Sequence, residues 1–294
     1  MKCHANRTYL FAPGNHQRRA EKAFGLSADA VILDLEDAVA IAEKVATREV
    51  VCQTLTRPRN CAGFVRVNAY DTEFCYGDVQ AIVSGDLDGI VLPKLESVED
   101  LKSVDWLLFN LERERGLAPG SIDLMPIIET ARGVAAIRDL VRAGTRVRRL
   151  AFGAGDYTRD LAMDWSLDEA ELLPIRAEMV LASRLGRLEP PVDTVFIHLK
   201  EREAFRASCE TARSMGFQGK MCIHPDQILV TNDAFTPSAE SVAWSAKVVA
   251  AFAEAEKAGV ASIQIDGYFV DYPIVEKAQR ILDTAAFLGA VGKP

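Results

Sequence analysis

Short apolar runs rich in Val, Ile, Leu and Phe recur along the chain, with longer amphipathic segments between them. They predict eight strands, at residues 8–12, 30–35, 63–68, 89–94, 124–129, 149–155, 192–199 and 219–224. Such recurring runs are typical of parallel strands in a buried sheet, and segments such as "LKSVDWLLFNLERERG" predict helices between them. Eight strand–helix units over about 230 residues favour a TIM (β/α)8 barrel.

A doubly wound open sheet is the structural alternative, but it usually has fewer strands, and no GxGxxG motif follows the first strand. The pattern changes after the eighth strand. A long helix is predicted at 238–259, closed by Gly259, and a short turn at 263–273 leads to a last helix at 274–289. We therefore predict a TIM-barrel catalytic domain at residues 1–232 and a C-terminal helical extension or lid at residues 233–294.

Composition and charge narrow the class of partner. The hydrophobic content of 49% is ordinary for a globular protein, while the net charge of -8 argues against nucleic acid or an anionic membrane surface as the main partner. No stretch approaches the roughly 18 apolar residues of a membrane helix. Six cysteines show neither a CxxC pair nor metal-ligand spacing, and we expect buried thiols in a cytoplasmic protein: Cys3, Cys52, Cys61, Cys75, Cys209 and Cys222.

Polar residues concentrate where the predicted strands end. In a TIM barrel the carboxyl ends of the strands face the active site, so these residues are candidates for chemistry. They follow the strands in chain order: Pro13, Gly14, Asp34, Glu36, Asp37, Arg66, Asn68, Lys94, Glu129, Asp156, His198 and His224. The sequence therefore predicts acids and bases together on one rim.

Glu129 and Asp156 end two neighbouring strands. Two carboxylates without Cys or paired His beside them suit a hard cation, and Mg2+ fits best because water and substrate oxygens complete its octahedron. Gly153 and Gly155 would let the backbone approach a ligand closely. Either acid alone could equally cap the helix that follows it, but the pair together with the glycines favours a metal site.

Arg66 lies in the apolar context "FVRVN". A buried arginine is costly unless it is paired or meets an anion, so a substrate carboxylate or enolate is one candidate partner. An ion pair with Glu36 or Asp37 across the barrel mouth is the other. We expect the acids of "ILDLEDAV" to support Arg66, Lys94 or metal-bound water.

Other polar residues have a less specific pattern. His16, His198 and His224 lack a second His at ligand spacing and are expected to be structural. The basic residues Arg18, Arg19 and Lys22 follow the "APGNH" turn, where they form either a solvated helix face or a phosphate-contacting cluster.

Eight collinear motifs resemble one family. They are "RTYLFAPG", "AVILDLEDAV" followed by Lys44 and Arg48, "FVRVN", "GIVLPKLES", "PIIETARG", "FGAGDYTRDL", "GKMCIHPDQ" and "GYFVDYPIVEKAQ". Together they resemble the citrate lyase beta-subunit and malyl-CoA (citramalyl-CoA) lyase group of the HpcH/HpaI aldolase superfamily. The resemblance covers nearly the whole chain.

The resemblance implies a TIM barrel with a C-terminal lid, a cytoplasmic homotrimer or homohexamer, and a Mg2+ ion held by Glu129 and Asp156. It implies an acyl-CoA thioester substrate and a small 2-oxo acid product. In this reading Arg66 contacts the substrate and Asp271 is a catalytic acid delivered from the tail, commonly into a neighbouring subunit's site. Further residues are expected to bind substrate or CoA, or to support the site: Arg7, Lys22, Gly153, Ala154, Gly155, Glu36, Asp37 and Lys94.

The implied reaction is reversible cleavage of a 3-hydroxyacyl-CoA into acetyl-CoA, or a homologue, and a 2-oxo acid. Three alternatives stay open: the beta subunit of a citrate lyase complex acting on a carrier-bound citryl thioester, a malyl-CoA thioesterase, and a non-catalytic CoA-binding subunit. The chain departs from the family where relatives carry an aspartate late in the seventh strand, since "FIHLKE" places His198 and Glu201 there. This departure bears on the substrate.

Overall fold

The computed structural model describes residues 6–291, and the described chain divides into two compact units. The first unit is Asn6–Asp233, and the second begins at Ala234. Each unit has its own apolar core.

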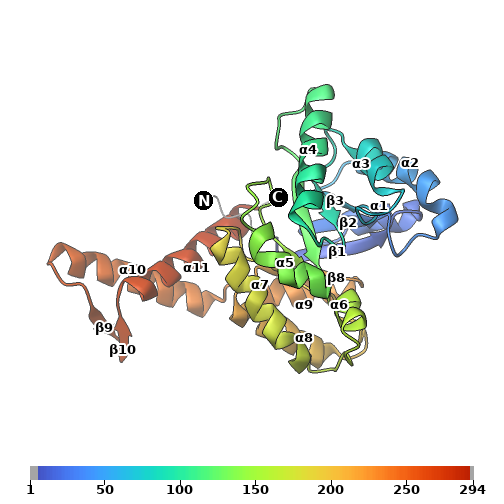
Figure 1. The fold of residues 1–294 in the computed structure, drawn as a ribbon. Coiled ribbons are helices and arrows are strands. Elements are labelled where there is room, and N and C mark those ends of the chain that lie inside the picture. The colour runs from blue at the N-terminus through green and yellow to red at the C-terminus, as the bar shows by residue number, and fades with distance from the viewer. Residues whose placement is uncertain (1–5, 292–294) are drawn as a thin grey trace. The chain divides into compact units, whose positions relative to one another are not determined.

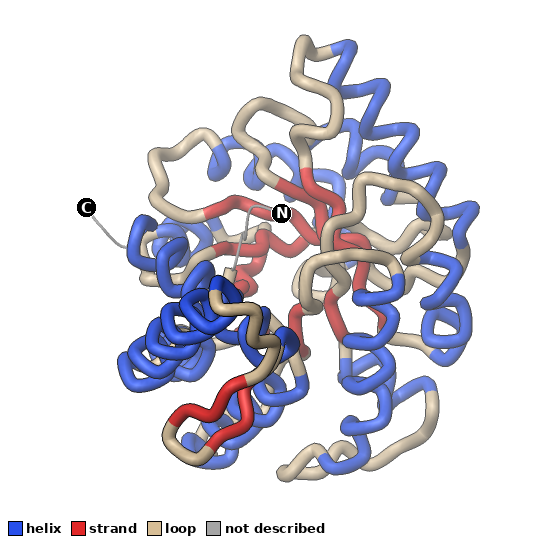
Figure 2. The backbone as a smooth tube through the Cα atoms, turned by 90° about the vertical axis from the view of Figure 1, so that its left-hand side faces the viewer, coloured by secondary structure: helices blue, strands red, loops and turns tan. Residues whose placement is uncertain are grey.

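Within the described part of the first unit, eight parallel strands close into a barrel in the order β1 to β8 (Figures 1 and 2). Figure 2 shows the strands in the middle and the helices around them. The strands are β1 (Thr8–Pro13), β2 (Ala30–Asp34), β3 (Ala62–Arg66), β4 (Gly89–Leu92), β5 (Asp123–Ile128), β6 (Ala151–Phe152), β7 (Val192–Asp193) and β8 (Gly219–Cys222). The TIM-barrel prediction is confirmed.

Helices connect successive strands and cover the outside of the barrel. They are α1 (Gln17–Phe24), α2 (Lys44–Leu55), α3 (Cys75–Ile82), α4 (Val98–Glu114), α5 (Ala131–Leu140), α6 (Ala154–Asp160), α7 (Leu173–Leu185), α8 (Arg202–Met215) and α9 (Asp226–Phe235). Short 3-10 helices precede α2 and α7, at Ile41–Glu43 and Ala170–Leu172.

The strands are buried on both faces, which explains their continuous apolar sequence. In β2, Ala30 and Ile32 belong to the central cluster inside the barrel, whereas Val31 and Leu33 alternate with them and are equally inaccessible. The inside is filled to contact: a Cβ added at Gly89 would lie 2.2 Å from the Phe64 ring. The barrel is therefore a packed core, and a ligand can enter only at its ends.

Two predicted strands are wrong in length. The strand expected at 149–155 ends at Phe152, because Gly153 leads directly into α6. The strand expected at 192–199 ends at Asp193, and the residues after it form a loop. Ile197 and Leu199 are about half exposed in that loop, at 46% and 54%, so their apolar character does not reflect strand burial.

The second unit comprises α10 (Ala239–Lys257), the strands β9 (Ile263–Ile265) and β10 (Tyr268–Val270), and α11 (Tyr272–Val291). The predicted simple turn is wrong, since β9 and β10 pair antiparallel as a hairpin. Asp266 and Gly267 form its tip with φ of 51° and 83°, which fits the Asp-Gly preference of two-residue hairpin turns. Val248, Phe252 and Val270 form the centre of this unit's core.

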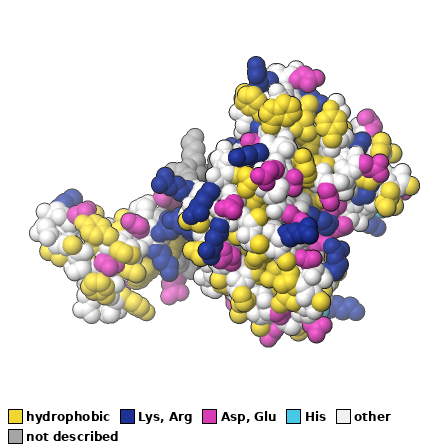
Figure 3. All heavy atoms as spheres, in the orientation of Figure 1, with side chains coloured by type: hydrophobic (Ala, Val, Ile, Leu, Met, Phe, Trp, Pro, Cys, Tyr) yellow, Lys and Arg dark blue, Asp and Glu magenta, His cyan; other side chains and the backbone are white. Residues whose placement is uncertain are grey.

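The surface mixes charges of both signs, and the prediction of buried thiols holds for three of the five described cysteines. Acidic and basic side chains are interspersed on the face drawn in Figure 3. The five described cysteines are free: Cys52 and Cys61 are half-buried, and the other three, Cys75, Cys209 and Cys222, are buried. Cys3 lies outside the described residues. Among residues 6–291 no helix combines the length and the apolar character needed to span a membrane.

A buried charge cluster joins β7 and β8 to the surrounding helices. The Asp193 carboxylate accepts hydrogen bonds from Nε and one terminal nitrogen of Arg176, each at 2.9 Å, and from the Lys220 ammonium at 2.5 Å. Arg176 also pairs with Glu169 at 2.6 Å. All four side chains are at most 1% exposed. Burial raises the pKa of Asp193, but Lys220 and Arg176 outweigh burial and hold it below its usual value. Asp193 is thus the shared anion of two buried cations.

Asp193→Asn should strongly destabilise the barrel. The substitution leaves Lys220 and Arg176 buried without their shared counter-charge, which typically costs about 3–5 kcal/mol of unfolding free energy. Urea denaturation at pH 7 measures the loss. The control is Asp233→Asn, because Asp233 and its partner Arg206 are exposed and such pairs contribute little. Equal urea midpoints for the two variants would contradict this account of the cluster.

Candidate functional site

A cavity of about 450 Å³ opens at the carboxyl ends of the barrel strands. One set of lining residues is charged, namely Asp34, Asp37, Arg66, Glu129 and Asp156. The others are small or apolar apart from Thr194: Phe11, Ala12, Pro13, Ala38, Ile127, Gly153, Ala154, Gly155, Thr194, Val195, Met221 and Ile223. Metal-site, substrate-site and supporting candidates from the ends of β2, β3, β5 and β6 therefore share one site.

Arg66 is held by a two-pronged ion pair with Asp34. These residues end β3 and β2 and are register partners; Nε and one terminal nitrogen of Arg66 contact the two Asp34 oxygens at 2.7 and 2.6 Å. Burial raises the pKa of Asp34, but the Arg66 guanidinium outweighs burial and holds it below its usual value. The Phe11 ring lies 4.9 Å from the guanidinium carbon. The side chain is thus fixed in position.

The ion-pair alternative for Arg66 therefore holds, with Asp34 as the main partner. Arg66 also contacts Glu36 at 2.9 Å and Asp37 at 3.5 Å. The sequence placed Asp34 on the rim but did not single it out. The two-pronged pair depends on the register of β2 and β3, which aligns Asp34 with Arg66 and which the sequence pattern does not give.

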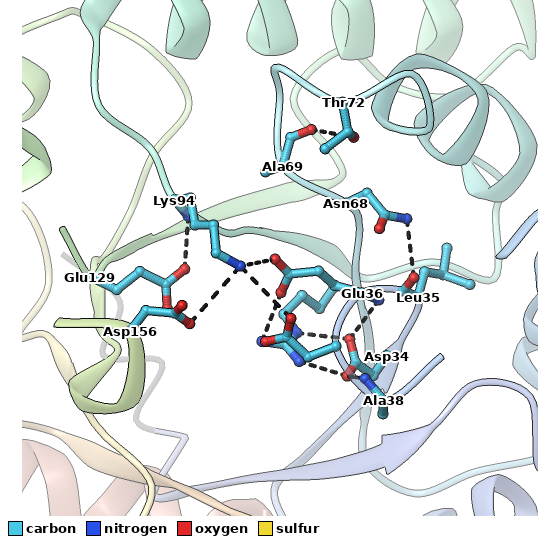
Figure 4. A network of polar contacts seen from close by, with 12 residues as sticks. Asp34, Leu35, Glu36, Ala38, Asn68, Ala69, Thr72, Lys94, Glu129 and Asp156 are labelled. Atoms are coloured by element: carbon cyan, nitrogen blue, oxygen red, sulfur yellow. Dashed lines mark hydrogen bonds and ion pairs between the residues drawn. The ribbon is translucent and has the colours of Figure 1, made fainter. Parts of the chain in front are cut away.

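Lys94 connects this ion pair to the other side of the cavity (Figure 4). Its ammonium pairs with Glu36 and lies 3.8 Å from Asp37 and 3.9 Å from Asp156. Its backbone is left-handed, with φ of 51°, and its amide N–H donates to Glu129 at 2.8 Å. A lysine in this conformation is strained, which is typical of residues that position a site.

Glu129 is a deeply buried acid of the cavity with a strongly raised pKa. It is 3% exposed, and burial together with the negative charges of Asp156 and Glu36 raises its pKa to about 8. Figure 4 shows the carboxyl groups of Glu129 and Asp156 side by side. A cation between them would relieve this repulsion.

Gly153 provides the space that the Glu129 carboxyl group occupies. A Cβ added at Gly153 would lie 2.2 Å from the carboxyl oxygen Oε2 of Glu129, which is far inside van der Waals contact. A Cβ at Gly155 would meet only the Trp165 ring, at 3.7 Å. The two glycines of the motif therefore differ: Gly153 is required for the acid, whereas Gly155 is open.

Asp156 lies in the first turn of α6. Its other contact is Arg159, at 2.5 Å, whose side chain is 73% exposed. The start of this helix is held by Thr194, whose hydroxyl accepts the Ala154 N–H at 2.8 Å, and both residues are buried. Thr194 did not emerge from the sequence because the segment around it resembles a plain strand.

The helix-cap alternative is wrong for Glu129. Thr130 is the N-cap of α5, since its hydroxyl accepts the Gly133 N–H at 3.0 Å. Glu129 therefore lies before the cap and faces the cavity. Asp156, as a first-turn acid, still has the position that the alternative describes.

A polar network behind the rim supports the turn after β2. The Lys44 ammonium donates to the Glu36 carbonyl at 2.7 Å and to the Asn68 side chain at 2.6 Å. Asn68 in turn donates to Asp78, which pairs with Arg48 at 2.8 Å. Sequence patterns alone do not reveal that Asp78, in α3, is part of this network.

Three further predicted site residues, Arg7, Lys22 and Asp271, come from other segments of the chain. Arg7 precedes β1, at the end opposite the cavity, and donates to Asp29 at 2.7 and 2.9 Å. Lys22 is exposed in α1, which follows the cavity-lining end of β1. Asp271 belongs to the second unit, where it directly precedes α11 and its side chain accepts the Ile274 N–H at 3.5 Å.

The loop after β7 carries the departures from the family pattern. His198 is half-buried with its ring against Phe196, and its Nε2 has no hydrogen-bond partner among the described residues. Glu201 begins α8 without a side-chain cap hydrogen bond. His224 accepts the Asp226 N–H at 3.2 Å, as expected for a structural histidine, and His16 precedes α1.

The donor set of the cavity suits a hard divalent cation. Among residues 6–291 no group of three or more His, Cys, Asp and Glu side chains has an arrangement that could hold a metal. Two carboxylates are nevertheless sufficient for Mg2+, which fills its other positions with water and ligand oxygens. The close carboxyl groups of Glu129 and Asp156, one of them deeply desolvated, fit this ion.

Comparison with known proteins identifies relatives along nearly the whole chain. Residues 7–225 match the family description HpcH/HpaI aldolase/citrate lyase. The chain is 31% identical over 290 residues to citrate lyase subunit beta of Escherichia coli K12, covering 98% of this chain and 96% of that protein. It is 34% identical over 291 residues to a (3S)-malyl-CoA thioesterase of Cereibacter sphaeroides, covering 98% of both chains.

A solved structure extends the similarity to three dimensions. CitE of Mycobacterium tuberculosis, in complex with magnesium, acetoacetate and coenzyme A, superposes with a TM-score of 0.79 at 28% identity. The match covers 96% of this chain and 99% of that one.

Gly153→Ala should weaken binding of a divalent cation by roughly 10- to 100-fold, the usual effect of displacing a ligand's support. The reason is that the added methyl group must displace the Glu129 carboxyl group. Titration calorimetry with Mg2+ measures the affinity, and Gly155→Ala is the matched control, expected to stay close to the parent protein. Equal affinities for the two variants would show that Glu129 does not bind the ion.

Proposed function

The chain belongs to the HpcH/HpaI aldolase/citrate lyase family, and we propose that it is a Mg2+-dependent carbon–carbon lyase. Its proposed substrate is a 3-hydroxyacyl-CoA such as malyl-CoA or citramalyl-CoA. The products are acetyl-CoA, or a homologue, and a 2-oxo acid, and the reaction is reversible. The observation that carries this proposal is the grouping of Glu129, Asp156 and Arg66 around one cavity.

Glu129 and Asp156 are the proposed ligands of Mg2+. Both are oxygen donors, and the burial and like charge that raise the pKa of Glu129 favour a cation between the two carboxyl groups. When bound, the ion would act as a Lewis acid and orient the 2-oxo acid part of the substrate. Lys94 positions Glu129 through its amide N–H and lies close to Asp156.

Arg66 is the proposed stabiliser of developing charge. When the bond between the two halves of the substrate breaks, its electron pair stays on the carbon next to the thioester and forms an enolate. A fixed guanidinium favours that charge more than one that must reorient, and Arg66 is fixed by Asp34, Glu36 and Phe11. Glu36 and Asp37 are thus supporting residues.

Asp271 is the proposed acid that protonates the enolate carbon, or removes that proton in the condensing direction. The hydroxyl group of the substrate meanwhile gives its proton to solvent water and becomes the carbonyl of the 2-oxo acid, so the proton released offsets the one that Asp271 delivers. This assignment rests on the family motif "FVDYP", which contains Asp271. A homotrimer or homohexamer would allow the tail of one subunit to serve the cavity of another.

We propose that the CoA part of the substrate approaches the cavity over the start of α1 and the start of α6. Gly153, Ala154 and Gly155 line the cavity with backbone or small side chains, so a ligand can come close to this segment. Lys22 is the proposed contact for the CoA phosphates. We do not extend this role to Arg7, because its guanidinium is engaged by Asp29 at the other end of β1.

Two related activities are supported by specific relatives. The similarity to a malyl-CoA thioesterase favours hydrolysis of the thioester as a second candidate. The similarity to citrate lyase subunit beta favours cleavage of a carrier-bound citryl thioester. Both would use the same cavity and differ in the products.

Product analysis should separate these activities. The purified protein is incubated with malyl-CoA, citramalyl-CoA and citryl-CoA, each with Mg2+ and with excess EDTA, and the products are separated by liquid chromatography. We expect acetyl-CoA that appears only with Mg2+. Free CoA with intact hydroxy acid would mean a thioesterase, whereas cleavage of a citryl carrier-protein thioester alone would mean a citrate lyase subunit.

Asp271→Asn should lower kcat by about 10²- to 10⁴-fold, the usual contribution of a general acid, without changing Mg2+ affinity. The matched control is Asp266→Asn, in the same hairpin region, where the left-handed backbone tolerates Asn. Steady-state kinetics and Mg2+ calorimetry give the two readouts. A parallel loss of metal affinity, or an equal loss of kcat in the control, would remove Asp271 from the mechanism.

A further inference from the structure

A second cavity, of about 400 Å³, lies against α7 and α8, which run side by side on the outside of the barrel (Figure 1). Its lining comes from the segment that precedes α7, from α7 itself and from α8: Leu167, Asp168, Glu169, Arg176, Ala204, Ala207, Ser208 and Thr211. None of these residues lines the cavity at the carboxyl ends of the strands. The two cavities are therefore separate.

Glu169 places a carboxyl group at the wall of this second cavity. Its oxygen Oε2 accepts hydrogen bonds from Arg176 and from the Ser208 hydroxyl, both at 2.6 Å, and both partners line the cavity. The other oxygen, Oε1, is buried without a hydrogen-bond partner among the described residues, and the whole side chain is only 1% exposed. A buried acceptor costs free energy until a donor reaches it, and the cavity gives a donor access.

The charge that the cavity leaves unmatched is negative. The buried cluster behind it is neutral, since it holds two cations and two carboxylates, namely Arg176, Lys220, Glu169 and Asp193. Asp168 adds one more carboxylate at the exposed edge of the lining. Within residues 6–291 its hydrogen-bond partners are a neighbouring hydroxyl and a backbone N–H, both uncharged. A ligand with one positive charge would balance the lining.

The oxygen without a partner selects the type of cation. Because Oε2 is already occupied, Glu169 offers one oxygen and cannot receive the two parallel N–H groups of a guanidinium. A primary ammonium group is a compact donor that needs only one such oxygen. The remaining lining includes apolar side chains, namely Leu167, Ala204 and Ala207. Contacts of this kind suit an alkyl chain better than a hydrated metal ion.

We propose that this cavity binds a small primary amine, in its ammonium form, that carries a short alkyl chain. The ammonium group donates to Oε1 of Glu169, the alkyl chain packs against Ala204 and Ala207, and Asp168 matches the positive charge. Water alone would satisfy Oε1 but would leave the apolar lining without a partner. The site lies outside the catalytic cavity, so it stands or falls independently of the proposed lyase function.

Three matched probes test the proposal. n-Propylammonium chloride has a charge and N–H donors, 1-propanol has a donor without charge, and tetramethylammonium chloride has a charge without a donor. We expect calorimetry at constant ionic strength to show saturable binding of propylammonium, at least about tenfold tighter than binding of either other probe. Absence of saturable binding, or equal affinity for one of the other probes, would overturn the proposal.

Filling the cavity locates the bound amine. Ala207→Leu adds a side chain at an exposed position of the lining, and the control Ser214→Leu adds the same side chain at an exposed position of α8 outside it. We expect the first variant to weaken propylammonium binding by at least about tenfold and the second to leave it unchanged. Thermal unfolding verifies that both variants are folded. Unchanged affinity in Ala207→Leu would place the amine elsewhere and contradict the assignment.

Asp168→Asn tests the contribution of charge. The variant keeps a side-chain oxygen for the local hydrogen bonds and removes the negative charge at the edge of the cavity. We expect the affinity for propylammonium to fall by about two- to fivefold, as for an exposed ion pair, while binding of 1-propanol stays the same. An unchanged ratio of the two affinities would show that the cavity does not select a cation, and would overturn the assignment to an amine.

Discussion

The ion pair between Asp34 and Arg66 is the contact on which the rest of the cavity depends. It joins the ends of β2 and β3, and charges of alternating sign continue from it around the rim. Arg66 contacts Glu36, Glu36 contacts Lys94, and Lys94 donates its amide N–H to Glu129. Arg66, Glu36 and Lys94 thus compensate one another's charge, which is the condition for placing charges at a partly buried barrel mouth.

Glu129 is the place where this compensation is incomplete. Its partner in the rim is an amide N–H, and Asp156, the neighbouring charge that acts on it most strongly, is of the same sign. The strained backbone of Lys94 and the missing side chain of Gly153 both hold the Glu129 carboxyl group in this unfavourable position. Two like-charged carboxyl groups held in this way are typical of a cation site, since a bound cation would offset the repulsion between them.

The same principle separates two neighbouring residues, the last residue of β7 and the one after it. Asp193 is buried outside the barrel among Arg176 and Lys220, where its charge is fully matched and its role is structural. The next residue, Thr194, lines the cavity and holds the start of α6. Matched buried charges therefore stabilise the scaffold, and unmatched charge collects at the cavity, where a ligand can provide the partner.

The sequence alone determined the barrel and the side of it on which chemistry occurs. Apolar strand runs mark both-face burial, and the carboxyl ends of parallel strands in a barrel meet at one mouth, so Arg66, Lys94, Glu129 and Asp156 were placed together. Only the tertiary structure decided the contacts among them. The pairing of Arg66 with Asp34, the left-handed turn at Lys94 and the short strands β6 and β7 depend on register and packing between segments distant in sequence. Local sequence patterns do not predict these features, because each contact depends on two segments that are distant in sequence, whereas a local pattern describes only one segment.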